Sequence, residues 1–230
     1  MSDKIYRLGC DIGGTFTDFV LLNDRTGELT INKCLTTPGD PSDAVEYGIR
    51  QLDERVPGFV KCLDEVIHGT TLVINSIIER KGARTGLMTT LGFRDVLELG
   101  REIRYAPYDV FAEFPKPLIP RSLRFELDER VRSDGTVLKP LDPGEARKVV
   151  RQMLEMGVES IAVCLLNSFE NPSHEQMVKD IVLEEAPDIS VCISYEVLPQ
   201  IREYERTSTT ATNAYVKPLT GKYLYKLAKR

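Results

Sequence analysis

The stretch Asp11-Ile12-Gly13-Gly14-Thr15-Phe16-Thr17-Asp18 decides how this chain of 230 residues begins to fold. It joins two strand-like segments, residues 5–12 and 16–22, and residues 29–35 form a third such segment after a polar turn. Gly13 and Gly14 are expected to supply the positive φ of a tight turn. The sequence therefore predicts an antiparallel meander of three strands.

The same octapeptide has the residues expected of a phosphate-binding turn. Glycines leave backbone N–H groups uncovered, so that they can donate to phosphate oxygens, and Thr15 and Thr17 add hydroxyl donors. Asp11, at the end of its strand, can hold Mg²⁺ or orient an attacking water. The alternative is a plain hairpin turn with solvated carboxylates, but the two threonines and Asp18 between good strands favour phosphate binding.

Helix and strand patterns alternate through the rest of the first hundred residues. The expected elements are a helix capped by Ser42, a strand at 65–68, a helix from Thr70 or Thr71 through Arg80, a strand at 85–89 and a helix at 93–99. The predicted class is α/β, and the order β-β-β-α-β-α-β-α matches by analogy the ribonuclease-H-like core of actin, Hsp70 chaperones and sugar kinases.

Four regions are predicted along the chain. They are a ribonuclease-H-like core with the phosphate turn at 1–100, an irregular insertion and a strand pair at 101–142, an α/β segment at 143–199, and the helical start of a following domain at 200–230, interrupted at Lys217-Pro218. Proline and aromatic residues, among them Tyr105, Pro107 and Phe114, make residues 103–120 a candidate lid or interface. Asp134-Gly135 is expected at the turn of the strand pair in 123–137.

Composition favours a cytoplasmic globular protein. The net charge of −5 comes from 30 basic and 35 acidic residues that are interspersed, which argues against binding to nucleic acid. The first residues show no secretion signal, and no apolar run approaches the roughly 20 residues that a membrane helix needs. The five cysteines are widely spaced, which is typical of reduced thiols in a cytosol.

Several motifs resemble the hydantoinase A/oxoprolinase family, which includes ATP-dependent hydantoinases, 5-oxoprolinases and subunits of acetone and acetophenone carboxylases. The octapeptide is similar to the family's first phosphate motif. The later matching blocks are His68-Gly69-Thr70-Thr71 with Asn75 and residues 79–87, Gly92-Phe93-Arg94-Asp95-Val96-Leu97-Glu98, and residues 196–199 with 202–210. The resemblance covers nearly all of the chain.

The resemblance implies the N-terminal portion of an ATP-dependent hydrolase of cyclic amides, which phosphorylates the substrate carbonyl. It equally allows a subunit of an acetone- or acetophenone-type carboxylase, and a non-catalytic assembly module or inactive fragment is a further alternative. ATP and Mg²⁺ are the implied cofactors, and a second subunit of the hydantoinase B type is the implied partner. The expected site consists of Asp11 and His68 as catalytic residues, Asp11 as the metal ligand, and Gly13, Gly14, Thr15, Phe16, Thr17, Asp18, Thr70 and Thr71 around the nucleotide.

Each of the later candidates also has a structural explanation. His68 ends an apolar strand before a helix start, where a histidine is often structural, and Thr70 or Thr71 fits a helix cap equally well. The basic cluster from Arg80 to Arg84 could bind an acidic substrate or a phosphate, but basic residues near a helix end ordinarily face solvent, and that is the favoured interpretation. His174 is expected to be exposed, because it follows a proline-led helix start.

The sequence lacks one feature of actin-like ATPases, which close the nucleotide cleft with a second glycine hairpin and an adenosine-binding motif. Neither is present in these residues. The isolated polypeptide is therefore expected to have weak nucleotide affinity and negligible ATPase activity.

Overall fold

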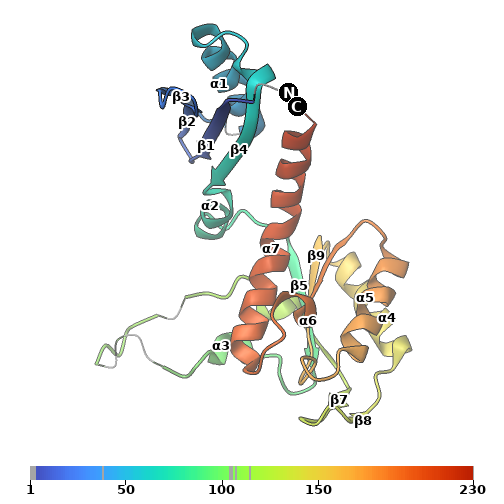
Figure 1. The fold of residues 1–230 in the computed structure, drawn as a ribbon. Coiled ribbons are helices and arrows are strands. Elements are labelled where there is room, and N and C mark those ends of the chain that lie inside the picture. The colour runs from blue at the N-terminus through green and yellow to red at the C-terminus, as the bar shows by residue number, and fades with distance from the viewer. Residues whose placement is uncertain (1–3, 38, 104–105, 107, 114, 230) are drawn as a thin grey trace. The chain divides into compact units, whose positions relative to one another are not determined.

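The computed structural model of the chain describes residues 4–37, 39–103, 106, 108–113 and 115–229. The chain falls into two compact units: unit 1 comprises Met1–Lys81 and Leu219–Arg230, and unit 2 comprises Gly82–Pro218. Each unit combines helices with strands, and the strand pairs are both parallel and antiparallel (Figure 1). The predicted α/β class is confirmed at this level.

Unit 1 is built on a four-stranded sheet with the order β3-β2-β1-β4. Its strands are β1 (Tyr6–Ile12), β2 (Phe16–Asn23), β3 (Leu29–Leu35) and β4 (Leu63–Thr70). β1, β2 and β3 pair antiparallel, which confirms the predicted meander, and β4 lies parallel to β1. The strand predicted at 65–68 therefore exists, with longer bounds.

Successive side chains of this sheet alternate between its two faces, as the strand period requires. The core face carries the buried residues Leu8, Cys10, Ile12, Phe19 and Leu21. The outer face carries Asp11 and Asp18, which are cross-strand partners, and it leaves Val20 and Ile31 exposed.

The core face is covered by helix α1. The helices of unit 1 before its return segment are α1 (Pro41–Arg55), the 3₁₀ helix η1 (Phe59–Cys62) and α2 (Leu72–Ile78). Gly48 lets α1 approach closely, because a Cβ there would lie 2.1 Å from the Phe19 ring. Asp40 is the N-cap, and its carboxylate accepts from the Ser42 N–H, so the predicted cap at Ser42 was wrong. Pro41 is suited to the first helical position, which moves the cap to the residue before it.

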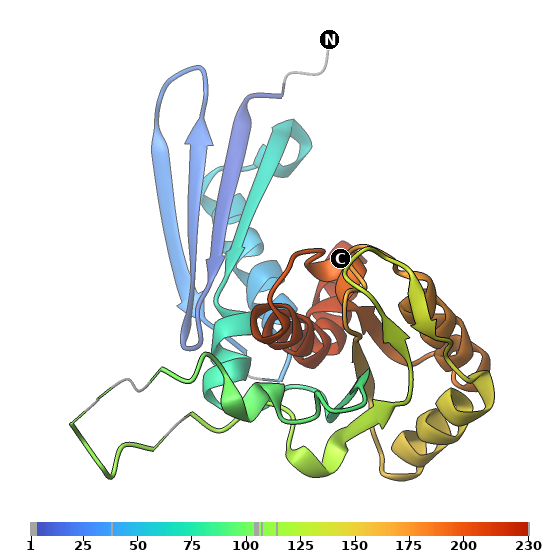
Figure 2. The same cartoon turned by 90° about the horizontal axis from the view of Figure 1, so that it is seen from below.

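Unit 2 contains a parallel sheet with the order β10-β9-β5-β6. Its strands are β5 (Thr85–Thr90), β6 (Arg124–Leu127), β9 (Ser160–Cys164) and β10 (Ser190–Ile193). Helices α4 (Pro143–Glu155) and α5 (Ser173–Glu185) cover one face, and residues 203–218 of helix α7 (Glu203–Ala228) lie on the other (Figures 1 and 2). These helices and strands agree with the α/β pattern predicted for 143–199, apart from shifts at their ends.

The strand predicted at 85–89 belongs to this second sheet and does not extend the sheet of unit 1. All six residues of β5 are buried, and both edges of the strand are paired. A strand that is buried on both faces shows no alternation that would assign it to a particular sheet.

The remaining elements of unit 2 are short. They are α3 (Val96–Leu99), η2 (Arg121–Leu123), β7 (Arg130–Val131), β8 (Val137–Lys139) and α6 (Ser194–Val197). β7 and β8 form an antiparallel hairpin with Asp134-Gly135 between them, which confirms the predicted turn, whereas β6 joins the parallel sheet. The helix predicted at 93–99 is reduced to α3.

Two further predictions for the second half of the chain were wrong. Helix α7 (Glu203–Ala228) continues through Pro218, so there is no interruption at Lys217-Pro218. Burial of Ala214, the residue one turn before the proline, and of other apolar residues of this helix compensates for the lost backbone bond. His174 is only 5% exposed.

The candidate lid is irregular where it is described. Between Gly100 and Pro120 the described residues contain no helix or strand, and Tyr108, Val110 and Phe111 are strongly exposed. Tyr105, Pro107 and Phe114 lie outside the described residues. Among the helices that are described, none is both long enough and apolar enough to cross a membrane.

Candidate functional site

A pocket of about 460 Å³ in unit 1 lies where the glycine turn meets the carboxyl end of β4. The polar residues and glycines that line it come from four places. These are the glycine turn, the residue after β3, the end of β4, and helix α2 with the residues that follow it. These lining residues are Gly13, Gly14, Thr36, Thr70, Thr71, Asn75, Ser76, Glu79 and Lys81. Four residues of the predicted site, Gly13, Gly14, Thr70 and Thr71, are thus brought together.

The turn is closed by a bond from the Gly13 N–H to the Phe16 carbonyl, 2.9 Å in length. Neither Gly13 nor Gly14 has a positive φ, so the predicted reason for these glycines was wrong. Close approach is the observed reason, because a Cβ on Gly13 would lie 3.0 Å from the Phe16 carbonyl oxygen and a Cβ on Gly14 would lie 3.2 Å from Asn75 Nδ2.

Hydrogen-bond donors at the turn are left for a ligand. Within the described part of the chain, no group accepts a hydrogen bond from the N–H of Gly14 or of Thr15. Thr70 Oγ1 accepts from the Leu72 N–H at 3.1 Å, which leaves the hydroxyl hydrogen of Thr70 for another acceptor. Asn75 Nδ2 donates to Thr71 Oγ1 at 3.0 Å, so the amide of Asn75 is held beside Gly14. Together these groups can receive an anion.

Thr17 supports the turn from inside the protein. It is fully buried, and its hydroxyl lies 3.0 Å from that of Thr36, which donates to the Gly13 carbonyl at 2.9 Å. Thr17 therefore fixes the shape of the turn and does not line the pocket.

Phe16 and Asp18 lie outside the pocket. Asp18 is paired with Lys33 at 2.8 Å, and the ammonium of Lys33 lies 4.7 Å from the centroid of the Phe16 ring. Both residues are on the outer face, as is Asp11, whose carboxylate lies beside Gly69 of the neighbouring strand.

Asp11 and His68 face opposite sides of the sheet. Asp11 pairs with Gly69 on the outer face, whereas His68 pairs with Cys10 on the core face. His68 Nε2 lies 2.7 Å from the hydroxyl of Tyr223, and burial raises the pKa of Tyr223 to about 12. Tyr223 therefore stays protonated and can donate to His68.

A second contact joins the C-terminal part of α7, which contains Tyr223, to the start of α1. Lys226 donates to the carboxylate of Asp40, the N-cap of α1, at 2.5 Å. The bond from Lys226, together with the bonds from Ser42, lowers the pKa of Asp40 from 3.8 to about 2. Leu219, in the same helix segment, lines the pocket, so these contacts position part of the pocket wall.

We expect Asp40→Asn to lower the melting temperature at neutral pH, because the ion pair with Lys226 is lost. The contribution of a carboxylate with a depressed pKa is fully present above its ordinary value and is lost as the pH falls through the folded value. The difference from wild type should therefore shrink between about pH 4 and pH 2, with values of 3.8 and about 2 setting this window. Thermal unfolding against pH measures the effect, with exposed Asp188→Asn as a charge-matched control. An equal effect of both substitutions at neutral pH would contradict it.

Several lining residues are not among the site residues predicted from the sequence. Asn75 belongs to a family-like block, and its position four residues after Thr71 on a predicted helix could have indicated their contact. Thr36 reaches the turn only through the pairing of β2 with β3, which the sequence does not specify. Lys81 was expected to face solvent because it follows a helix end.

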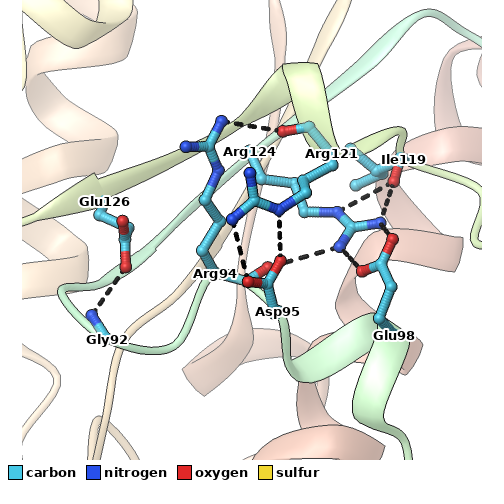
Figure 3. Close-up of polar contacts among 8 residues, drawn as sticks. All are labelled: Gly92, Arg94, Asp95, Glu98, Ile119, Arg121, Arg124 and Glu126. Carbon is cyan, nitrogen blue, oxygen red and sulfur yellow. Dashed lines mark hydrogen bonds and ion pairs between the residues drawn. The ribbon is translucent and has the colours of Figure 1, made fainter.

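The block from Gly92 to Glu98 lies in unit 2 and forms a network around Arg124 (Figure 3). Arg124 is fully buried; it donates to the Ile119 carbonyl from Nε at 3.0 Å and from Nη2 at 2.6 Å, and to both oxygens of Glu98. Arg121 binds Asp95 at 2.7 and 3.0 Å. These contacts connect the segment after β5 to the start of β6, so the block from Gly92 to Glu98 has a structural role in unit 2.

The block at 202–210 likewise anchors α7 to the parallel sheet of unit 2. Arg206 is 1% exposed, and it donates to the Leu165 carbonyl at 2.6 Å and to Ser168 Oγ at 2.9 Å. Nearby Glu175 is buried, which raises its pKa, and it accepts from Ser194 Oγ at 2.6 Å.

His174 is buried by a specific pair of contacts. Its Nδ1 lies 2.7 Å from Glu129, and its Nε2 accepts from the Leu141 N–H at 3.4 Å. The second contact requires Nε2 to be unprotonated, which puts the proton on the nitrogen that faces Glu129. This partner is far away in the sequence, so local pattern could not predict the burial.

The described residues contain no group of three or more His, Cys, Asp or Glu side chains that could hold a metal ion. Mg²⁺ carried by a nucleotide needs only one or two protein carboxylates besides the phosphates. A single carboxylate such as Asp11 is compatible with that arrangement.

Comparison with known proteins agrees with these motifs. The family described as the hydantoinase/oxoprolinase N-terminal region matches residues 7–186, which is most of the chain. The chain belongs to this family. In this hydantoinase/oxoprolinase member, the matched range includes the glycine turn, β4 and the residues around Lys81.

Relatives and solved structures extend the comparison. The chain is 40% identical to the caprolactamase subunit alpha of Pseudomonas jessenii over 99% of its own length, and 38% identical to the acetophenone carboxylase gamma subunit of Aromatoleum aromaticum over 94%. The crystal structure of the ATP-dependent caprolactamase from Pseudomonas jessenii superposes with a TM-score of 0.88 at 38% identity, over 97% of this chain and 33% of that one. The nucleotide-free acetone carboxylase structure gives 0.88 at 28% identity, over 98% and 34%.

The chain spans about a third of the length of the curated relatives that it matches: 33% of the caprolactamase subunit and 31% of the acetophenone carboxylase subunit.

Proposed function

We propose that unit 1 binds the phosphates of ATP at the glycine turn of Gly13 and Gly14, with Thr70 and Thr71 as further donors. The observation that carries this proposal is that the Gly14 and Thr15 N–H groups, which donate to no described residue, belong to a turn that lines a pocket. Backbone amides of this kind are suited to phosphate oxygens. The ATP-dependent relatives support the assignment.

We further propose that the protein belongs to an ATP-dependent hydrolase of cyclic amides. ATP would supply a phosphoryl group that makes the carbonyl oxygen of a poorly reactive amide a leaving group. Caprolactamase subunit alpha, 40% identical to this chain, and the 5-oxoprolinase of Dictyostelium discoideum, 28% identical, support this substrate class. A second subunit of the hydantoinase B type is the proposed partner.

A carboxylase subunit is the second candidate. The acetophenone carboxylase gamma subunit is 38% identical and the acetone carboxylase beta subunit of Xanthobacter autotrophicus is 30% identical. In that chemistry, phosphorylation traps the enol of a ketone. The lining of the phosphate pocket suits both reactions, because each starts from the same nucleotide.

Asp11 is the proposed ligand of nucleotide-bound Mg²⁺, and Thr15, Phe16, Thr17 and Asp18 are the proposed frame of the turn. A ribonuclease-H-like identity is proposed for the first sheet, and a cytoplasmic location is proposed for the protein, with which the five free cysteines are consistent. The regions 1–100, 101–142, 143–199 and 200–230 are proposed as divisions of the sequence, and the two compact units cut across them.

His68 is proposed to act in the site through Tyr223. Its contact with the α7 segment that contains Leu219 gives it a way to position the pocket wall, even though it faces away from Asp11.

Asp11→Asn tests the metal assignment. In a protein that carries this chain together with the remaining length found in its relatives, the substitution should remove ATP turnover, because the Mg²⁺ ligand or water-orienting group is lost. Circular dichroism should stay unchanged, since Asp11 is exposed. Asp64→Asn, at the other end of the sheet, is the control. Wild-type turnover in the Asp11 variant would contradict the assignment, and absence of MgATP binding by the wild-type protein would refute the proposed function.

A further inference from the structure

Two charged side chains of the described residues line the phosphate pocket, Glu79 and Lys81. Lys81 Nζ lies 2.6 Å from Glu79 Oε2. Both side chains are largely exposed, at 74% and 51%. An exposed ion pair of this kind contributes little to stability, so either partner can exchange it for another contact at small cost.

The backbone brings Lys81 back to the pocket. Helix α2 ends at Ile78, and Arg80 then adopts a left-handed conformation with a φ of 55°. This reversal lets the Lys81 N–H donate to the Ser76 carbonyl at 2.9 Å, the pattern of a helix that closes with a left-handed residue. A left-handed arginine is unfavourable by itself, so the reversal is maintained by its surroundings.

The neutral donors of the pocket need a positive charge to match a phosphoryl chain. The N–H of Gly14, the hydroxyl of Thr70 and the amide of Asn75 carry no net charge, and Glu79 repels an anion. The lysine ammonium is a compact cation with three donors on a flexible stem, which suits a phosphate group. Lys81 is the cation that the described lining provides.

We propose that Lys81 is the cationic ligand of the phosphoryl chain at the glycine turn, and that Glu79 holds Lys81 when the pocket contains no anion. This inference rests on the proposed function and names the part of the nucleotide that unit 1 recognises. The described lining of the pocket includes no aromatic side chain that could stack on a base. The recognised chemical class is therefore an inorganic or nucleotide-linked polyphosphate, independent of the base.

The two members of the pair should have opposite effects when they are neutralised. Lys81→Gln removes an attraction, whereas Glu79→Gln removes both a repulsion and the competing partner of Lys81. No general loss of stability gives this pattern, because a damaged fold weakens binding in both variants.

Isothermal titration with inorganic tripolyphosphate, and separately with MgATP, tests the proposal in a protein that carries this chain together with the remaining length found in its relatives. Lys81→Gln should raise the dissociation constant for tripolyphosphate about tenfold, the effect of one charge-assisted hydrogen bond. Glu79→Gln should lower it about threefold to tenfold. Lys81→Arg should stay near the wild-type value. Lys61→Gln, before β4, and Glu28→Gln, in the turn between β2 and β3, are charge-matched controls at the opposite end of the sheet and should change little.

The outcomes separate this inference from the function on which it rests. If the chain binds tripolyphosphate but Lys81→Gln behaves as Lys61→Gln does, or Glu79→Gln weakens binding, Lys81 is not the cationic ligand while the phosphate site stands. Binding of MgATP without any binding of tripolyphosphate overturns recognition of the phosphoryl chain alone. If neither probe binds, the inference and the proposed function both fail. Should Lys81→Gln lose its fold, the sign of the Glu79→Gln effect still decides.

Discussion

Gly14→Val is expected to weaken the binding of tripolyphosphate about tenfold to a hundredfold while the sheet of unit 1 stays folded. A Cβ at this position would already lie 3.2 Å from Asn75 Nδ2, and valine adds two methyl groups. Asn75 cannot move away without breaking its 3.0 Å bond to Thr71. The branched side chain would also cover the Gly14 N–H that we assign to the phosphate.

Titration calorimetry with tripolyphosphate measures this effect, and circular dichroism checks the fold. Gly39→Val is the matched control, because no atom lies within 4 Å of the position of its Cβ. Gly14 has no positive φ, so the substitution imposes no backbone strain that could explain a loss of binding. Equal affinities of the Gly14 and Gly39 variants would contradict the assignment of the turn.

Arg124→Met is expected to destabilise unit 2 by about 1–3 kcal/mol, the usual cost of leaving a buried hydrogen-bonding group without its partner. The Arg124 side chain is fully buried, whereas Glu98 is 43% exposed and can be hydrated when its partner is gone. The larger part of the cost therefore comes from the Ile119 carbonyl, which would lose both of its bonds from Arg124. Methionine fills much of the volume, so a cavity does not dominate the effect.

Urea unfolding, followed by circular dichroism, gives the free energy for this variant. The control is Arg121→Met, which removes the neighbouring pair with Asp95 in which both side chains are roughly half exposed, at 58% and 45%. An exposed pair of this kind contributes about 0–1 kcal/mol. Comparable losses in the two variants would show that burial of Arg124 does not set its contribution.

Local patterns were sufficient for much of the fold. The meander of β1, β2 and β3 follows from alternation of apolar residues and from the turns between them, and α4 follows from helical spacing after Pro143. Local patterns failed where a partner distant in the sequence decides the outcome. β5 is buried on both faces, so its sequence does not distinguish the two sheets, and His174 is buried because Glu129 and Leu141 bind it.

The candidate site was predicted in the same uneven way. The glycines and threonines could be named because a phosphate turn has a characteristic composition. The register between β1 and β4 could not be read from either strand, and it is this register that separates Asp11 from His68. For the basic cluster that contains Lys81, the sequence favoured a solvent-facing role over phosphate binding, because the position of Lys81 depends on the left-handed conformation of Arg80, which nothing about an arginine predicts.

Lys81 is the last residue of unit 1 before unit 2 begins, and Leu219 is the first residue of unit 1 after unit 2 ends. Both residues line the pocket. None of the described residues between 82 and 218 lines this pocket, so unit 2 is an insertion in the sequence of unit 1 that does not contribute to the described pocket wall. A designer could substitute a brief linker for residues 82–218 and obtain a miniature receptor for polyphosphate, composed of one sheet, its covering helices and the last turns of α7.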